Sequence, residues 1–108
     1  MCGIAGFIGR KAFPVERTSR ALFRMRNRGP DAQKIRTFSI QVGGSIHLLH
    51  SRLSILDLGP RSDQPMERDE CHLVVNREIY NYLELRGEFK ALGRILTKKS
   101  DTKVLLQA

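Results

Sequence analysis

Apolar and polar residues alternate over several short stretches of this chain, which is the pattern of strands that bury one face. Five stretches have the length and composition of strands, at residues 3–8, 38–42, 45–49, 52–56 and 71–75. Gly43 and Gly44 separate two of them, and a glycine pair between alternating runs indicates a hairpin turn. The pattern therefore predicts a β-hairpin within a set of short strands.

Three other segments are expected to be helical, at residues 14–27, 81–92 and 103–108. The second is the clearest, because Tyr82, Leu85 and Phe89 fall on one helical face, Asn81 can cap its start and Gly93 supplies its stop. Together the strands and helices predict an α+β domain. The third helix would be cut short at the end of the chain, so the domain is expected to be truncated.

The composition is that of one small globular domain, with 108 residues of which 41% are hydrophobic and 28% charged. Its start lacks the order of a signal peptide, and no run of about 18 apolar residues could span a membrane. These features predict a cytoplasmic protein in which Cys2 and Cys71 stay unpaired. Neither cysteine lies at metal-ligand spacing from the other or from a histidine, so no metal site is expected.

The charge balance is strongly basic, with a net charge of +8 and nine of the nineteen basic residues within residues 10–36. Arg17, Arg20, Arg24 and Arg28 recur at steps of three and four, so they would share one face of the first helix. Zinc-finger spacing and strands rich in aromatic residues are missing. A solvated helix face is the favoured interpretation, contact with a partner protein is the alternative, and nucleic-acid binding is not expected.

Cys2 directly follows Met1, so removal of Met1 would place a thiol and a free α-amino group on the same residue. An α-amino group titrates at about 7.7–8.0, so a useful fraction is unprotonated near neutral pH. Such an amine can take the proton of the thiol and return it to a leaving group, without any histidine. Cys2 is therefore a candidate nucleophile, and the alternative is a small buried residue at the head of a strand.

Six short blocks follow one another along the chain. They are Cys2-Gly3-Ile4-Ala5-Gly6, Arg28-Gly29-Pro30-Asp31, Arg52-Leu53-Ser54-Ile55-Leu56-Asp57, Gln64-Pro65-Met66, Asn76-Arg77-Glu78-Ile79-Tyr80-Asn81-Tyr82 and Ser100-Asp101-Thr102. Their order resembles class II glutamine amidotransferases, and it is most similar to the N-terminal glutaminase domain of glutamine-hydrolysing asparagine synthetases. The resemblance spans essentially the whole chain. Since such domains are longer, residues 1–108 would be the N-terminal part of one, without the synthetase domain.

The resemblance implies an N-terminal-nucleophile hydrolase fold, a four-layer αββα sandwich of mostly antiparallel sheets, of which this chain would form the N-terminal half. It also implies that Cys2 attacks the side-chain amide of glutamine, releases ammonia and leaves a glutamyl thioester that water hydrolyses. The amine of Cys2 would act as general acid and base, and the side chain of Asn76 would donate to the oxyanion. Loss of one such donor costs on the order of 10²–10³ in rate.

A site for the charged head of glutamine is also implied by the resemblance. Arg52 resembles the arginine that binds the α-carboxylate, a task to which a rigid guanidinium fork is suited. Glu78 and Asp101 resemble the acidic pair that receives the α-ammonium group, and backbone atoms around Ile55 and Leu56 would complete the pocket. The alternatives are ordinary surface charges for Arg52 and Glu78 and a helix cap for Asp101.

Arg77 departs from the family pattern, which usually has glycine after the oxyanion asparagine. A glycine lets the backbone approach the substrate and supplies a second N–H, whereas the side chain of Arg77 can block that approach. Arg77 thus belongs to the expected catalytic and glutamine-binding set with its role in question. Two functions stay open: an active glutamine-hydrolysing enzyme that supplies ammonia to an acceptor such as aspartate, and a catalytically impaired domain that binds glutamine or a partner.

Glutamine hydrolysis of this kind would need no cofactor, and ATP and Mg would be needed only by the absent synthetase domain. The implied partners are glutamine and a synthetase domain or partner protein that accepts the ammonia. A homodimer is left open, and neither a membrane nor a nucleic acid is expected as a partner.

Overall fold

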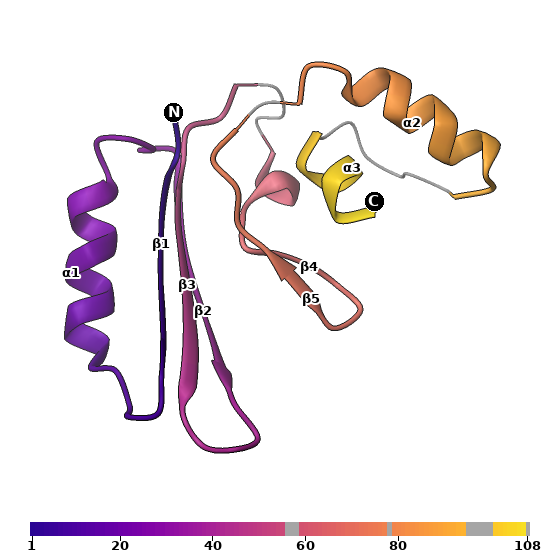
Figure 1. The fold of residues 1–108 in the computed structure, drawn as a ribbon. Coiled ribbons are helices and arrows are strands. Elements are labelled where there is room, and N and C mark those ends of the chain that lie inside the picture. The colour runs from indigo at the N-terminus through magenta and orange to yellow at the C-terminus, as the bar shows by residue number, and fades with distance from the viewer. Residues whose placement is uncertain (56–58, 78, 95–100, 108) are drawn as a thin grey trace.

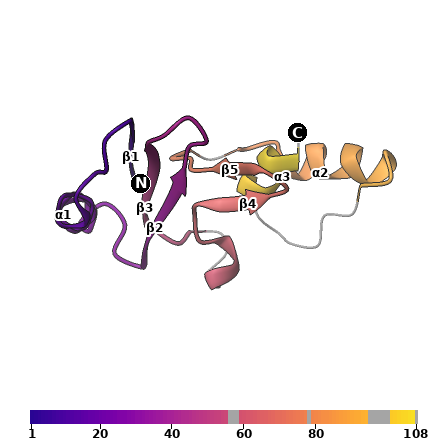
Figure 2. The same ribbon diagram turned by 90° about the horizontal axis from the view of Figure 1, so that it is seen from below.

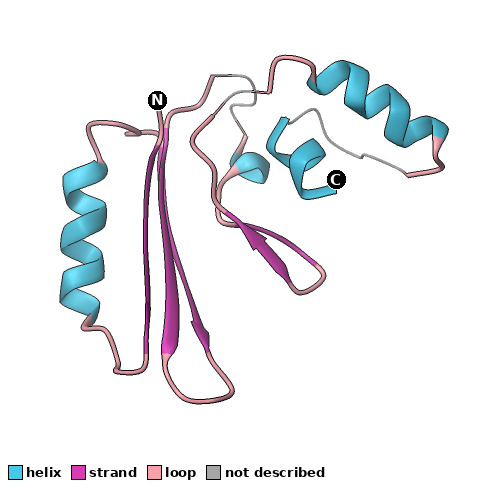
Figure 3. Ribbon diagram, viewed as in Figure 1, coloured by secondary structure: helices cyan, strands magenta, loops and turns pink. Residues whose placement is uncertain are grey.

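The computed structural model describes residues 1–55, 59–77, 79–94 and 101–107, and these form an α+β structure with antiparallel strands (Figure 1). The larger sheet has the order β1-β3-β2, with β1 (Gly3–Gly9), β2 (Ala32–Ser39) and β3 (Ser45–Arg52). A second sheet pairs β4 (Met66–Arg68) with β5 (Cys71–Leu73). The helices are α1 (Val15–Met25), α2 (Tyr82–Ala91) and α3 (Asp101–Gln107), with a 3-10 turn at Pro60–Ser62 (Figure 3). The predicted α+β class is confirmed.

The three-stranded sheet lies between α1 and the hairpin formed by β4 and β5 (Figure 2). On one face, Oγ of Ser51 in β3 lies 3.1 Å from the carbonyl oxygen of Met25 in α1. On the opposite face, the ring of Phe38 in β2 contacts the ring of His72 in β5, with centroids 4.0 Å apart. Within the described residues, no helix is long and apolar enough to cross a membrane.

The end of β3 is buried and mostly polar. Its last four residues, Leu49, His50, Ser51 and Arg52, are all buried, and His50 is only 1% exposed. Charged and polar side chains are rarely buried unless they have partners, so their position calls for an explanation beyond core packing. This end of the sheet also holds the start of β1, because β1 and β3 run antiparallel with Gly3 opposite Ser51.

Two strands differ from the sequence-based expectation. A strand over residues 38–42 is wrong, because β2 ends at Ser39 and a turn follows, in which the N–H of Gly43 donates to the carbonyl of Ile40 across 2.9 Å. Gly43 and Gly44 take φ values of 87° and 117°, which glycine adopts readily, so the glycine pair does mark the turn. The strand expected at residues 52–56 is also wrong in its described part, since β3 begins earlier and ends at Arg52.

The helices agree more closely with their prediction. Gly93, with φ of 77°, ends the second helix, and its N–H and that of Arg94 donate to the carbonyls of Lys90 and Phe89. Asn81 occupies the cap position of this helix but makes no side-chain cap bond. The first helix ends at Met25 rather than residue 27, so Arg28 lies beyond it and not on its basic face.

Candidate active site

Cys2 lies at the end of the sheet where β1 begins and β3 ends. The register of the two strands pairs Gly3 with Ser51, and its continuation by one residue brings Cys2 opposite Arg52. The backbone N–H of Leu53 donates to Sγ of Cys2 across 3.3 Å, and the thiol lies 3.7 Å from the carbonyl oxygen of the same residue. The half-buried thiol is therefore anchored on backbone atoms at the end of β3.

The backbone nitrogen of Cys2 is an amide here, because Met1 precedes it. Met1 is 75% exposed, so it is open to removal, and the carbonyl of Cys2 accepts a bond from Nε of Arg28 across 3.4 Å. This contact restrains the main chain of Cys2 at its carbonyl group, on the side of the residue opposite to the backbone nitrogen. Removal of Met1 would thus create a free amine on a residue whose carbonyl and sulfur are both already bonded.

The turn at Gly29 to Asp31 braces the same end of β3. A Cβ on Gly29 would lie 2.1 Å from the carbonyl oxygen of Ser51, so only glycine permits this approach. The hydroxyl of Ser51 donates to the carbonyl of Gly29 across 2.7 Å, and the N–H of Asp31 donates to the carbonyl of Arg52 across 3.0 Å. The carboxylate of Asp31 accepts from the N–H of Ser54 across 2.6 Å. The second sequence block therefore fixes the backbone on which Cys2 rests.

Arg52 is buried beside Cys2 and held by two oxygen partners. Its Nη1 donates to the carbonyl of Gly59 and to Oδ1 of Asp63, each across 2.8 Å. The other carboxylate oxygen of Asp63 lies 3.2 Å from Nζ of Lys34. At 7% exposure, Arg52 is not an ordinary surface charge, so that alternative is wrong. A guanidinium fixed by charge-assisted bonds is oriented before any anionic ligand arrives.

His50 connects this end of the sheet to the loop that follows β5. Burial, above all, lowers the pKa of the His50 imidazole from its usual value near 6.5, and Arg52 lowers it further, while a bond with the backbone of Val75 and the charge of Asp63 oppose this. His50 is therefore neutral near pH 7. Its Nε2 has no hydrogen-bond partner among the residues that the structure describes.

Gln64 is buried between two segments that carry predicted site residues. Its Oε1 accepts from the backbone N–H of Val75 across 2.6 Å, and its Nε2 donates to the hydroxyl of Thr102 across 3.4 Å. Val75 directly precedes Asn76, and Thr102 directly follows Asp101. The loop after β5 runs toward the end of the sheet where β1 begins (Figure 1).

The structure brings the sequence segments of the predicted site together, although not all of their side chains are described. Asn76 is half-buried and Arg77 is exposed, both in the loop after β5. Ile55 is 60% exposed, two residues beyond the contact between Leu53 and Cys2. The remaining predicted site residues lie outside the described part, namely Leu56, Glu78 and the side chain of Asp101.

Three residues of this region escaped the sequence-based prediction, Asp63, His50 and Gln64. His50 precedes Arg52 by two positions and so shares its face of β3, and Gln64 begins one of the six blocks, so both carried a signal. Asp63 carried none, because its partners Arg52 and Lys34 lie far from it in sequence. In the described part of the chain, no group of three or more histidine, cysteine or acidic residues could hold a metal ion.

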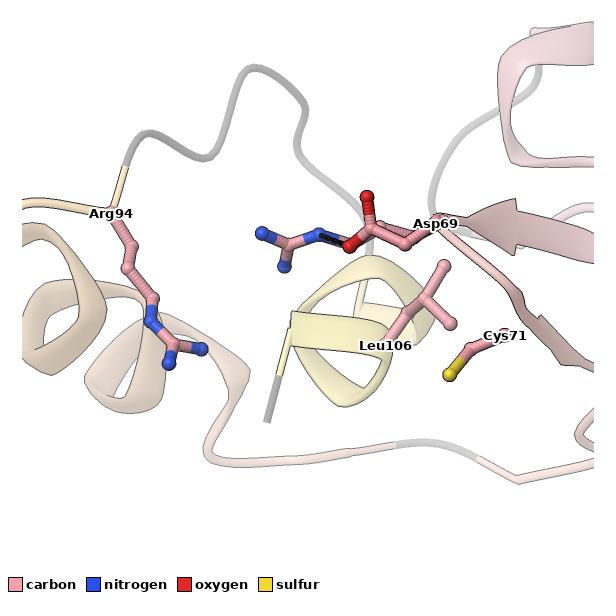
Figure 4. A pocket seen from close by; sticks show the side chains of 5 residues that line it. Asp69, Cys71, Arg94 and Leu106 are labelled. Carbon is pink, nitrogen blue, oxygen red and sulfur yellow. Dashed lines mark ion pairs between the residues drawn. The ribbon is translucent and has the colours of Figure 1, made fainter.

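A separate hollow of about 380 Å³ lies between the hairpin and the last two helices (Figure 4). Its lining residues are Arg68, Asp69, Cys71, Arg94 and Leu106. Nε of Arg68 lies 3.7 Å from a carboxylate oxygen of Asp69 at its edge. Among the described residues, none of those predicted for glutamine binding lines this hollow, so the candidate site is taken at the buried end of β3.

Comparisons with known proteins identify the family of the chain. The family described as "Glutamine amidotransferase domain" matches residues 1–108. Asparagine synthetase (glutamine-hydrolysing) 3 of Bacillus subtilis is 35% identical over 100% of this chain and 18% of its own length, and asparagine synthetase (glutamine-hydrolysing) 2 of Oryza sativa is 36% identical over 84% and 15%. Amidase chry2 of Gibberella zeae is 39% identical over 86% of this chain and 16% of its own length.

The chain spans only 15 to 23% of the length of these and similar curated relatives. No solved structure gives a significant match. The family match nevertheless covers every residue of the chain, including all six blocks. The chain therefore belongs to the glutamine amidotransferase domain family.

Proposed function

We propose that this chain is the N-terminal part of a glutaminase domain in which Cys2, after removal of Met1, hydrolyses the side-chain amide of glutamine. The observation that carries the proposal is the anchoring of Sγ of Cys2 by the N–H of Leu53, directly beside buried Arg52. This backbone donor fixes the position of the sulfur at the end of β3 before a substrate binds. The arrangement supports a nucleophile next to a cation that can hold an anionic substrate.

In the proposed reaction, the free amine of Cys2 takes the thiol proton and the sulfur attacks the amide carbon of glutamine. The negative charge that develops on the carbonyl oxygen is met by the side-chain N–H of Asn76. The C–N bond then breaks as the amine returns its proton to the leaving group, which departs as ammonia. Water, deprotonated by the same amine, hydrolyses the glutamyl thioester and restores the thiol.

Arg52 is proposed to bind the α-carboxylate of glutamine, and Glu78 with Asp101 its α-ammonium group. Backbone atoms around Ile55 and Leu56 would line the rest of the pocket. A ligand that carries both charges is held at two points, so its amide arrives in one orientation and amides without a charged head are rejected. Burial of Arg52 supports this role, since a buried cation attracts a carboxylate more strongly than an exposed one.

The ammonia is proposed to pass to a synthetase domain or partner protein, with aspartate as the default acceptor. The names of the bacterial and plant relatives support asparagine synthesis. ATP and Mg would serve only that acceptor reaction, and hydrolysis by Cys2 would need neither. We further propose that the antiparallel sheets and flanking helices belong to a four-layer αββα sandwich, in a cytoplasmic protein.

The second candidate function is glutamine binding without hydrolysis, because Arg77 replaces the glycine usual in the family. Arg77 is exposed in this structure, and an exposed side chain leaves the active enzyme as the first candidate. A bound glutamine could still meet this side chain, so the two functions need a direct comparison.

Ammonia release from glutamine tests the proposal, in the chain as purified and in its Cys2→Ala and Arg77→Gly variants, after intact-mass measurement has shown that Met1 is gone. We expect release by the parent chain and loss of release in Cys2→Ala. An inert parent with an active Arg77→Gly variant would favour the impaired function. Release that persists in Cys2→Ala would contradict the role of Cys2.

A further inference from the structure

Gln64 makes two hydrogen bonds that join the two sides of the proposed glutamine site. It is 6% exposed, and its amide group spans from the N–H of Val75 to the hydroxyl of Thr102. The residues next to these partners are Asn76, which is proposed to meet the oxyanion, and Asp101, which is proposed to meet the ammonium group. We infer that Gln64 is a positioning residue that fixes the spacing between Asn76 and Asp101, an inference that rests on the proposed function.

The bond to Val75 restrains the residue that follows. At 2.6 Å, it is among the shortest side-chain bonds in the described residues, and the His50 ring bonds the backbone of Val75 as well. Because peptide bonds are planar, few torsions separate a fixed Val75 backbone from the Cα of Asn76. The side chain of Asn76 therefore starts from a restrained backbone rather than from a free loop.

The bond to Thr102 acts on the other side. Thr102 is buried in the first turn of α3, so a bond to its hydroxyl restrains the start of that helix, where Asp101 lies. The segment that carries Gln64 comes between the 3-10 turn and β4, and the Gln64 side chain bonds both the loop after β5 and α3. One buried side chain thereby couples two segments that have no covalent link near the site.

The two bonds predict separable kinetic effects. Asn76 acts where charge develops in the transition state, so a loss of its position lowers kcat. Asp101 is proposed to bind the α-ammonium group, whose charge is the same in bound glutamine and in the transition state. A displaced Asp101 therefore weakens the binding of both and raises KM. A misplacement of about 1 Å in an active site can cost about 10²-fold in rate.

The test compares Gln64→Met, which keeps the volume but loses both bonds, with Thr102→Val, which loses the bond to Gln64 but keeps the bond between Gln64 and Val75. We expect Gln64→Met to lower kcat/KM for glutamine by about 10²-fold, mostly through kcat, and Thr102→Val to raise KM with kcat retained. The matched control is Gln41→Met, because Gln41 is exposed at the tip of the hairpin turn and should change neither parameter. Alkylation of Cys2 by iodoacetamide, which needs no bound glutamine, should proceed at the parent rate in all three.

The double variant Gln64→Met with Thr102→Val tests whether the two single variants act through the bond between Gln64 and Thr102. We expect its effect on KM to be smaller than the sum of the two single effects, because the shared bond can be lost only once. Additive effects on KM, or unchanged kcat in Gln64→Met, would overturn the inference.

If the parent releases no ammonia, the proposed function fails, and NMR tests the inference instead. Gln64→Met should then shift the amide signals of both Asn76 and Asp101, and shifts confined to one segment would overturn it.

Discussion

The backbone N–H of Leu53 donates a hydrogen bond to Sγ of Cys2 across 3.3 Å, although 51 positions separate the two residues in the sequence. The bond is possible because β1 and β3 pair antiparallel, so that β1 begins at the same end of the sheet where β3 ends. A thiol that accepts a backbone N–H at a strand end is held in place before any substrate binds. The properties of the site therefore depend on whatever keeps the end of β3 where it is.

Substitution of Gly29 by alanine should destabilise the protein. The new Cβ would lie 2.1 Å from the carbonyl oxygen of Ser51, and backbone atoms on both sides would have to shift. Strain of this kind costs typically about 1–3 kcal/mol of unfolding free energy, or more. Urea unfolding measures the change, and the rate of Cys2 alkylation should alter with it because the turn braces the same strand end.

Gly87→Ala is the matched control for this substitution. Gly87 is exposed within α2, and an added Cβ there would meet nothing within 4 Å. Alanine is favoured over glycine in a helix interior by about 1 kcal/mol, so this variant should be more stable than the parent. Equal effects of the two alanine substitutions would refute the close approach of Gly29 to β3.

Asp63→Asn should destabilise the fold and disturb Arg52. Both side chains of this pair are 8% exposed, so removal of the carboxylate takes a counter-charge away from a buried cation. Loss of one partner of a buried ion pair costs about 3–5 kcal/mol. Glu67→Gln serves as the control, because the pair of Glu67 with Arg36 is about half exposed and such pairs contribute less than about 1 kcal/mol. Similar losses in the two variants would contradict the buried position of Arg52.

Stability should fall as the pH drops below about 6.5, partly because of His50. Its pKa is lowered in the folded protein, so below its unfolded value near 6.5 the unfolded chain binds more protons than the folded one. The stabilisation is complete above pH 6.5 and is lost as the pH falls toward the folded pKa. Thermal unfolding from pH 7.5 to 5.0 should show a shallower decline for His50→Gln than for the parent. Parallel curves would contradict a lowered pKa of His50, which burial causes above all and to which the facing charges of Arg52 and Asp63 contribute in opposite directions.

Much of the fold was predictable, because β1, the hairpin glycines and the stop of α2 all rest on local patterns. The position of β2 was not, since Lys34 and Arg36 interrupt its apolar alternation and find their partners only in tertiary structure, at Asp63 and Glu67. Residues 38–42 appeared strand-like through Ile40 and Val42, yet the register that pairs Ser39 with Ser45 places both in the turn.

For the site, the six blocks indicated which segments to expect together, and contacts join Cys2 to Leu53 as that expectation requires. The supporting residues were less visible. The bond from Gln64 to Thr102 joins residues 38 positions apart, and no local sequence pattern predicts a contact between residues so far apart. Burial of Arg52 likewise depends on Gly59 and Asp63, whose proximity follows from the path of the chain after β3.

The most direct test of the central claim is mass spectrometry of the Met1-free chain, quenched in acid during incubation with glutamine, together with the ammonia released. The account predicts a glutamyl adduct confined to the peptide that carries Cys2 and ammonia in excess of the enzyme. A Cys2→Ser variant, which keeps the amine but has a weaker nucleophile, should show far less of both. A Met1-free parent chain that binds glutamine yet forms no adduct and releases no ammonia would contradict the claim.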